Sequence, residues 1–195
     1  MRTALVILAL AALVGAGAAG DPHWPARAVI QVWIDRQDAP PGGDTLVDKA
    51  MRTWTTAGDG RLRLTRTLVK DGADIHVAFV RGGGNYGETR PHVNATTGLI
   101  DRAEVAIAAE VPVDPLTRQI VAYLTALHEL GHALGLSHTT TFTDIMYLFR
   151  RPEDAPTYFG NYRARLRSAD DIGSATATGL SAYDVEALRA LYQEK

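Results

Sequence analysis

HELGHALGLSH, residues 128–138, holds three of the six histidines of this 195-residue chain. On an α-helix, His128 and His132 lie one turn apart, about 6 Å along the axis, and point to the same side. Their imidazoles can therefore bind one zinc ion, and Glu129 lies beside them, where it can act on a metal-bound water. The full pattern favours a metal site over a helix end that contains histidines by coincidence.

The position of His138 adds a geometric requirement. If the helix continued, six residues at about 100° each would turn His138 away from His132 and from the site. Gly135 is the residue that can adopt the positive φ needed to end the helix and return the chain. We therefore predict that the helix ends near Gly135 and that His138 becomes the third ligand, which leaves a fourth position for water.

The composition is that of one soluble globular domain, with 46% hydrophobic and 22% charged residues. The formal charge of −2 gives no reason to expect nucleic acid as a partner. The chain contains no cysteine, which excludes disulfides and thiolate ligands. A metal ion must therefore be bound by histidine and carboxylate side chains.

The first 20 residues, MRTALVILALAALVGAGAAG, combine an early arginine, an apolar run and small residues that include the A-x-A pattern of residues 16–18. This arrangement is typical of a cleaved signal peptide. A retained signal anchor is the alternative, but the apolar run is short for a membrane span of about 20 residues. We expect residues 1–20 to be the signal peptide and residues 21–195 to form one secreted domain, extracellular or periplasmic, with no stable membrane span.

Hydrophobic patterns predict five strands and three helices. The strands are expected at residues 26–35, 61–69, 73–80, 86–93 and 100–108. The first helix, residues 44–56, is expected to begin at Asp44 or Thr45, with Asp48 completing a capping box. The second is expected to begin at Asp114 and Pro115 and to run to Gly135, and the third to begin at Ser181 with Asp184 in its capping box. Residues 148–179 carry no clear pattern and are predicted to be irregular.

Two further stretches suggest other functions. GGGNYG, residues 82–87, fits the dinucleotide pattern G-x-G-x-x-G after a strand, but the sequence that follows contains Pro91 and turn formers instead of the required helix. An edge strand at residues 86–93 is therefore favoured over a nucleotide site. Arginines and aromatic residues within 148–179 are compatible with a single-stranded nucleic-acid surface, but acidic residues are interleaved with them, so a solvated loop is predicted.

The zinc motif resembles the signature of the metzincin peptidases, and DIMY, residues 144–147, resembles their Met-turn, with Met146 beneath the zinc. Within that clan the chain is similar to the matrixins, the matrix-metalloproteinase family. Three stretches carry this similarity: residues 46–67, 73–82 and 180–192. The resemblance implies an α+β metzincin fold over residues 21–195, with a twisted, mixed five-stranded sheet, two long helices and a C-terminal helix.

The resemblance also implies a function, that of a secreted zinc-dependent endopeptidase. One catalytic zinc would be bound by His128, His132 and His138, with Glu129 as general base for a zinc-activated water and with structural support from Gly135 and Met146. The substrate would be a protein or peptide, paired in extended form with the edge strand, and the enzyme is expected to be a monomer. The alternative, a catalytically silent zinc-binding protein on the same fold, is disfavoured because Glu129 is retained.

The chain departs from the animal matrixins in the loop after the third strand. In those proteins a long loop binds a structural zinc and calcium ions, whereas here the loop is short and holds a single histidine, His92. A structural zinc is therefore not expected. Calcium, held by carbonyl and carboxylate oxygens, is a further candidate to which the sequence assigns no residues.

Overall fold

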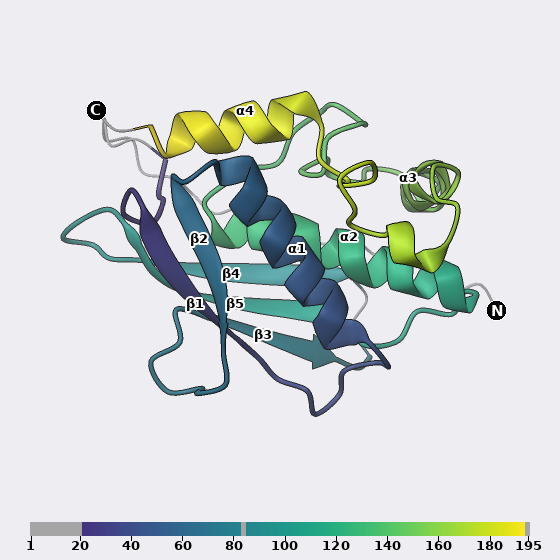
Figure 1. Cartoon of the computed structure of the whole chain (residues 1–195), viewed down its shortest axis with the longest axis horizontal. Coiled ribbons are helices and arrows are strands. Elements are labelled where there is room, and N and C mark those ends of the chain that lie inside the picture. The colour runs from purple at the N-terminus through teal and green to yellow at the C-terminus, as the bar shows by residue number, and fades with distance from the viewer. Residues whose placement is uncertain (1–20, 83–84, 194–195) are drawn as a thin grey trace.

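The computed structural model describes residues 21–82 and 85–193 (Figure 1). The expected signal peptide, residues 1–20, lies outside the described residues, so it stays a prediction. Among the described residues, none of the helices combines the length and the apolar character that a membrane crossing requires.

A single mixed sheet of five strands, in the order β2-β1-β3-β5-β4, forms one layer of the fold (Figure 1). The strands are β1 (Ala28–Ile34), β2 (Leu62–Thr67), β3 (Ile75–Val80), β4 (Gly87–Val93) and β5 (Ile100–Ala108). β1, β2, β3 and β5 run parallel, and β4 pairs antiparallel with β5 at one edge. All five predicted strands are confirmed, and so are the expected α+β class and the edge position of β4.

Two long helices, α1 (Gly43–Gly58) and α2 (Pro115–Ala133), pack side by side on the sheet. Figure 1 shows α1 beside β2, and α2 lies along β4 and β5. Trp54 of α1 is fully buried, and its indole N–H donates to the carbonyl oxygen of Leu127 in α2 at 2.8 Å. A large apolar ring with its one polar group satisfied is well suited to this helix contact.

The start of α1 differs from the prediction. The N-cap is Gly42, with no side-chain capping bond, so the capping box proposed for residues 44–48 is wrong. The carboxylates expected to cap the helix contact arginines instead: Asp44 and Asp48 lie 3.1 and 2.6 Å from Arg66 of β2. An ion pair between α1 and β2 is a long-range contact that the local sequence pattern does not reveal.

The segment predicted to be irregular contains a helix, α3 (Asp154–Arg163), and a short 3-10 helix at Ala169–Asp171. Phe159 and Tyr162 of α3 are buried, and the Tyr162 hydroxyl donates to the carbonyl of Ala177 at 2.6 Å. The prediction of an irregular segment is therefore wrong for residues 154–163 and 169–171, and that of a solvated loop is wrong for the buried rings of α3. Pro156 fits into α3 because it lies in the first turn, where the backbone N–H groups have no intrahelical partner.

Both ends of the described chain hold the C-terminal end of α2. The indole N–H of Trp24 donates to the Ala133 carbonyl at 2.8 Å, and the hydroxyl of Tyr192 donates to the Leu134 carbonyl at 2.9 Å. Tyr192 follows α4 (Ala182–Leu191), which begins at Ser181 with the predicted Asp184 capping box. The carbonyls that a helix leaves unpaired at its end are satisfied here by residues far away in the sequence.

The helix ends where the motif requires. α2 stops at Ala133, and Gly135 has a φ of 98°. A Cβ added to Gly135 would collide with the carbonyl oxygen of Pro22. Gly135 therefore serves both the turn and the close approach of the N-terminal segment, and the prediction that the helix ends near this residue is confirmed.

The substitution Gly135→Ala tests this constraint. We expect it to lower the free energy of unfolding of the metal-free protein by more than about 1 kcal/mol, because alanine is strained at positive φ and meets Pro22. Gly160→Ala is the matched control, since Gly160 lies inside α3 with nothing within 4 Å of an added Cβ, and alanine there is expected to stabilise by about 0.5–1 kcal/mol. Urea denaturation measures both, and equal effects would contradict the role of Gly135.

Candidate functional site

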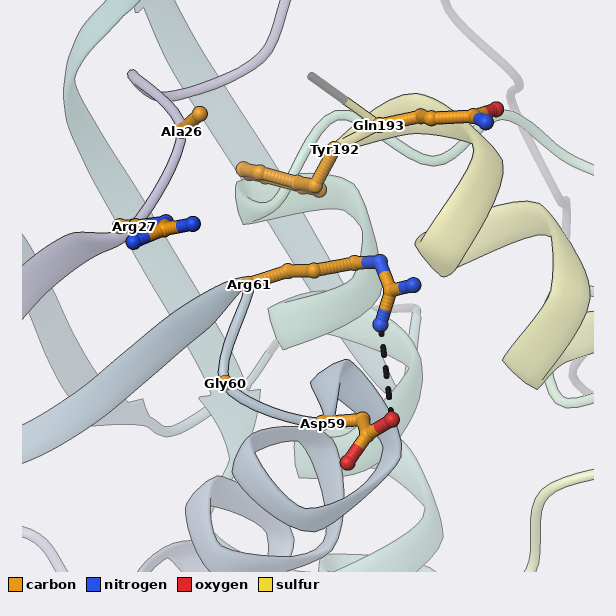
Figure 2. Close-up of a pocket in the computed structure, with 7 residues that line it drawn as sticks. All are labelled: Ala26, Arg27, Asp59, Gly60, Arg61, Tyr192 and Gln193. Atoms are coloured by element: carbon orange, nitrogen blue, oxygen red, sulfur yellow. Dashed lines mark ion pairs between the residues drawn. The ribbon is translucent and has the colours of Figure 1, made fainter.

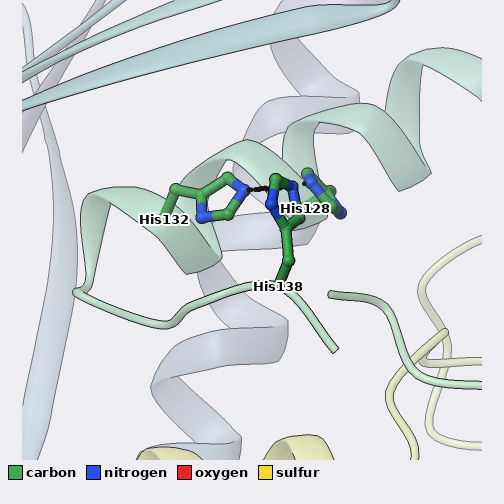
Figure 3. A group of neighbouring side chains, drawn as sticks. All are labelled: His128, His132 and His138. Atoms are coloured by element: carbon green, nitrogen blue, oxygen red, sulfur yellow. Dashed lines mark hydrogen bonds between the residues drawn. The ribbon is translucent and has the colours of Figure 1, made fainter. Parts of the chain in front are cut away.

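Three histidines that the sequence places apart come together at the end of α2 (Figure 3). His128 and His132 lie on the helix, and His138 lies on the chain that returns after it. The Nε2 atom of His132 is 3.1 Å from Nε2 of His128 and 3.0 Å from Nε2 of His138. Within the described part of the chain, this is the one group of three or more histidine or acidic side chains whose ligand atoms lie within 4.8 Å of one another.

The proton positions follow from two main-chain carbonyls. Nδ1 of His128 lies 2.6 Å from the Ile145 carbonyl oxygen, and Nδ1 of His132 lies 2.8 Å from the Leu136 carbonyl oxygen. Because a carbonyl can only accept, each Nδ1 carries the proton and each neutral ring turns an Nε2 lone pair toward the other. Tetrahedral zinc separates its nitrogen ligands by about 3.3 Å, so the spacing and the donor type both fit this ion.

Burial keeps these rings neutral. Together with the smaller effect of neighbouring imidazoles, it lowers the pKa of His128 to about 3 and that of His132 to about 4. The pKa of His138 is also lowered by burial. At neutral pH the three rings are therefore neutral, which is the state in which histidine binds a metal.

Glu129, the predicted general base, faces the edge strand β4. Its side chain is only 6% exposed, and burial raises its pKa to about 7, although the hydroxyl of Thr89 donates to Oε2 at 2.7 Å and acts in the opposite direction. A carboxyl group with this pKa can both accept and release a proton near neutral pH.

The predicted Met-turn lies directly beneath α2. Met146 is buried, and a Cβ added to Gly131 would lie 2.5 Å from its sulfur atom. The preceding residue, Ile145, accepts the Nδ1 proton of His128 through its carbonyl and donates its N–H to Asp184 of α4 at 2.9 Å. This turn therefore packs against α2 at Gly131 and orients the ring of His128.

Several residues of the site were not identified from the sequence. Gly131 could have been, because a glycine inside a helix costs about 1 kcal/mol relative to alanine and calls for a packing reason. Thr89 and Gly87 of β4, which both contact Glu129, carried no such signal. Asp184 was assigned only as a helix cap, although it also bonds to the Met-turn.

The arginine-rich segment after the Met-turn uses its aromatic rings for packing. Phe159 is buried, with its ring 5.2 Å from Tyr86 and 5.9 Å from Phe149. One of the arginines, Arg163, is paired with Asp114 at 2.6 Å. Rings packed against one another offer little face for base stacking, which argues against the single-stranded nucleic-acid alternative.

A surface pocket of about 500 Å³ lies apart from the histidine group (Figure 2). It is formed where β1 begins and where α1 and α4 end, and an ion pair between Arg61 and Asp59 at 3.6 Å spans part of it. The lining residues are Ala26, Arg27, Asp59, Gly60, Arg61, Tyr192 and Gln193. Neither Glu129 nor any of the three histidines contributes to it.

The lowered histidine pKa values predict an acid-tolerant metal site. Three ordinary histidines would lose zinc affinity by roughly a thousandfold between about pH 7.5 and 5.5, because protons compete below a pKa near 6.5. We expect the folded protein to lose less than about tenfold over that range. Competition with a chromophoric chelator measures the affinity, and a synthetic peptide of residues 128–138 is the control. Parallel losses in protein and peptide would contradict the prediction.

Comparison with known proteins agrees with this geometry. The matrixin family model matches residues 35–171. The chain is similar to an interstitial collagenase of Equus caballus, with 32% identity over 141 residues that cover 69% of this chain and 27% of that protein. It is also similar to the interstitial collagenase of Sus scrofa, with 33% identity over 153 residues that cover 74% of this chain and 29% of that protein. The chain thus spans less than a third of the length of these relatives. It belongs to the matrixin family of zinc metalloendopeptidases.

Proposed function

We propose that this chain is a secreted endopeptidase in which His128, His132 and His138 bind one catalytic zinc ion and Glu129 is the general base. One observation carries the proposal. Nε2 of His132 lies about 3 Å from Nε2 of both His128 and His138, and the residue after His128, Glu129, is buried and has a pKa of about 7. Ligands and base are the two parts that hydrolysis of a peptide bond by a metal-activated water requires.

Each residue of the site has a separate role in the proposed reaction. When bound, zinc would supply a Lewis acid for the attacking water and for the scissile carbonyl. The carbonyls of Ile145 and Leu136 hold two of the histidine rings in the tautomer that leaves Nε2 free to bind. Glu129 accepts a proton from the attacking water and then donates it to the nitrogen of the leaving amine.

The free edge of β4 is the proposed substrate site. Among the residues that the structure describes, β4 pairs with β5 alone, so its other side presents unpaired N–H and C=O groups along the strand. An extended peptide can add there as a further strand, with its main chain bound by hydrogen bonds and its side chains free to select neighbouring subsites. Since Thr89 of β4 contacts Glu129, a peptide bound at this edge lies close to the proposed base.

The proposed enzyme hydrolyses peptide bonds in a protein or peptide substrate. The relatives are named as collagenases, but this chain matches less than a third of their length, so their substrate is not carried over. Export rests on the signal-peptide pattern of residues 1–20. We further propose that the enzyme is a monomer with one zinc ion, and we assign no calcium site.

The substitution Glu129→Ala tests the proposal. Removal of a general base costs about 100- to 10,000-fold in rate, so we expect kcat to fall by that factor. The zinc content should stay near one equivalent, since Glu129 is not proposed as a ligand. Cleavage of a fluorogenic peptide library, with and without chelator, measures activity, and metal analysis measures zinc.

Glu186→Ala is the matched control, because Glu186 is exposed on α4. It should cleave at the wild-type rate. Hydrolysis that survives Glu129→Ala would show that the base is wrongly assigned. A wild-type protein that binds zinc but cleaves nothing in the library would support the catalytically silent alternative.

A further inference from the structure

We propose that Thr89 of the edge strand is a positioning residue, whose hydroxyl group fixes the Glu129 carboxylate for proton transfer. The inference rests on the peptidase function proposed above. The Oγ1 atom of Thr89 lies 2.7 Å from Oε2 of Glu129 and 2.9 Å from the main-chain oxygen of the same residue. A hydroxyl has one proton to donate, and the shorter contact is to the carboxylate.

Thr89 makes the one hydrogen bond to this carboxylate within the described residues. The bond matters because the terminal torsion of a glutamate is soft, and its oxygens otherwise take a broad range of orientations. The Glu129 side chain is 6% exposed, so water has little access to replace a missing donor. The orientation of the proposed base therefore depends on a residue of another element.

The second oxygen of the carboxylate is confined by the same strand. A Cβ added to Gly87 would lie 2.7 Å from Oε1 of Glu129 and 2.6 Å from its Cγ. Gly87 and Thr89 are two residues apart and therefore lie on the same face of β4, whereas the intervening Glu88 is exposed on the other. One face of β4 thus provides a donor for one oxygen and close main-chain packing for the other.

The main chain of Thr89 lies at the free edge of the sheet. The Ala108 N–H donates to the Tyr86 carbonyl at 2.8 Å, so the polar main-chain groups of Tyr86 face β5. Because these groups alternate in direction along a strand, those of Gly87, Thr89 and Pro91 face outward. Proline, which has no N–H, is expected at such an outward position. Thr89 therefore connects the proposed substrate edge, through its main chain, with the proposed base, through its side chain.

Three substitutions test this role. Thr89→Val removes the hydroxyl and keeps the β-branched shape, and Thr89→Ser keeps the hydroxyl. Thr65→Val makes the same change on β2 at the opposite edge of the sheet, where the hydroxyl bonds to the Ile30 carbonyl at 3.4 Å and not to Glu129. Each zinc-loaded protein is assayed for kcat and KM with a peptide that the wild type cleaves, and its zinc content and melting temperature are measured.

We expect kcat of Thr89→Val to fall by roughly 10- to 100-fold, the usual loss when a residue that orients a metal-site group is removed. KM should change by less than about twofold, since the main chain at the substrate edge is intact. The kcat of Thr89→Ser should lie within about threefold of the wild-type value. The kcat of Thr65→Val should equal the wild-type value. In a crystal structure of metal-free Thr89→Val, the Glu129 carboxylate should leave its position beside residue 89 or occupy more than one.

A wild-type kcat in Thr89→Val, or an equal loss of kcat in Thr89→Val and Thr89→Ser, would overturn the positioning role. So would a loss of kcat that coincides with loss of zinc or with unfolding at the assay temperature. An unmoved Glu129 in the variant structure would also overturn it. These results leave the peptidase proposal intact as long as Glu129→Ala lowers kcat by the expected factor of about 100 to 10,000. If the wild type cleaves no peptide, or if Glu129→Ala cleaves normally, the proposed function itself fails.

Discussion

The end of α2 is the constraint on which the site depends. A helix that continued past Gly135 would carry His138 away from His128 and His132, so the chain must reverse within a few residues. The reversal needs a residue without a Cβ, both for the φ of 98° at Gly135 and for the approach of the Pro22 carbonyl. Two distant side chains, Trp24 and Tyr192, satisfy carbonyls at this helix end. The two ends of the domain therefore stabilise the geometry of the histidines.

Burial produces the electrostatics of the site by one mechanism with two opposite results. Removal of water disfavours whichever form of a group is charged, so it lowers the pKa of the histidines and raises that of Glu129. Neutral imidazoles suit a metal ligand, and a carboxyl group that titrates near pH 7 suits a general base. The packing that creates this burial depends on small residues at contacts, notably Gly131 above Met146 and Gly87 beside Glu129.

Much of the fold could be predicted because its signals are local. Apolar and β-branched residues marked four of the strands, the glycines of residues 82–87 indicated the edge strand, and Asp114 with Pro115 marked the start of α2. The predictions failed where distant residues compete with a local pattern. Asp44 contacts Arg66 of β2 instead of capping α1, and α3 is held in place through Tyr162, whose hydroxyl bonds to Ala177. No local pattern marked α3, because its position depends on that tertiary packing.

The sequence by itself determined the family, the identities of the proposed ligands and base, and the residue at which the helix has to end. The family follows from the resemblance of residues 128–138 and 144–147 to the matrixin motifs. The ligands, the base and the helix end follow from residue types and spacing, because helix geometry converts spacing into direction. The tertiary structure alone decided which groups orient these side chains: the Ile145 and Leu136 carbonyls for the rings, and Thr89 with Gly87 for the carboxylate. Leu136 lies within the motif and Ile145 shortly after it, whereas Thr89 and Gly87 lie on β4, with Thr89 40 residues before Glu129, and only folding brings them to the site.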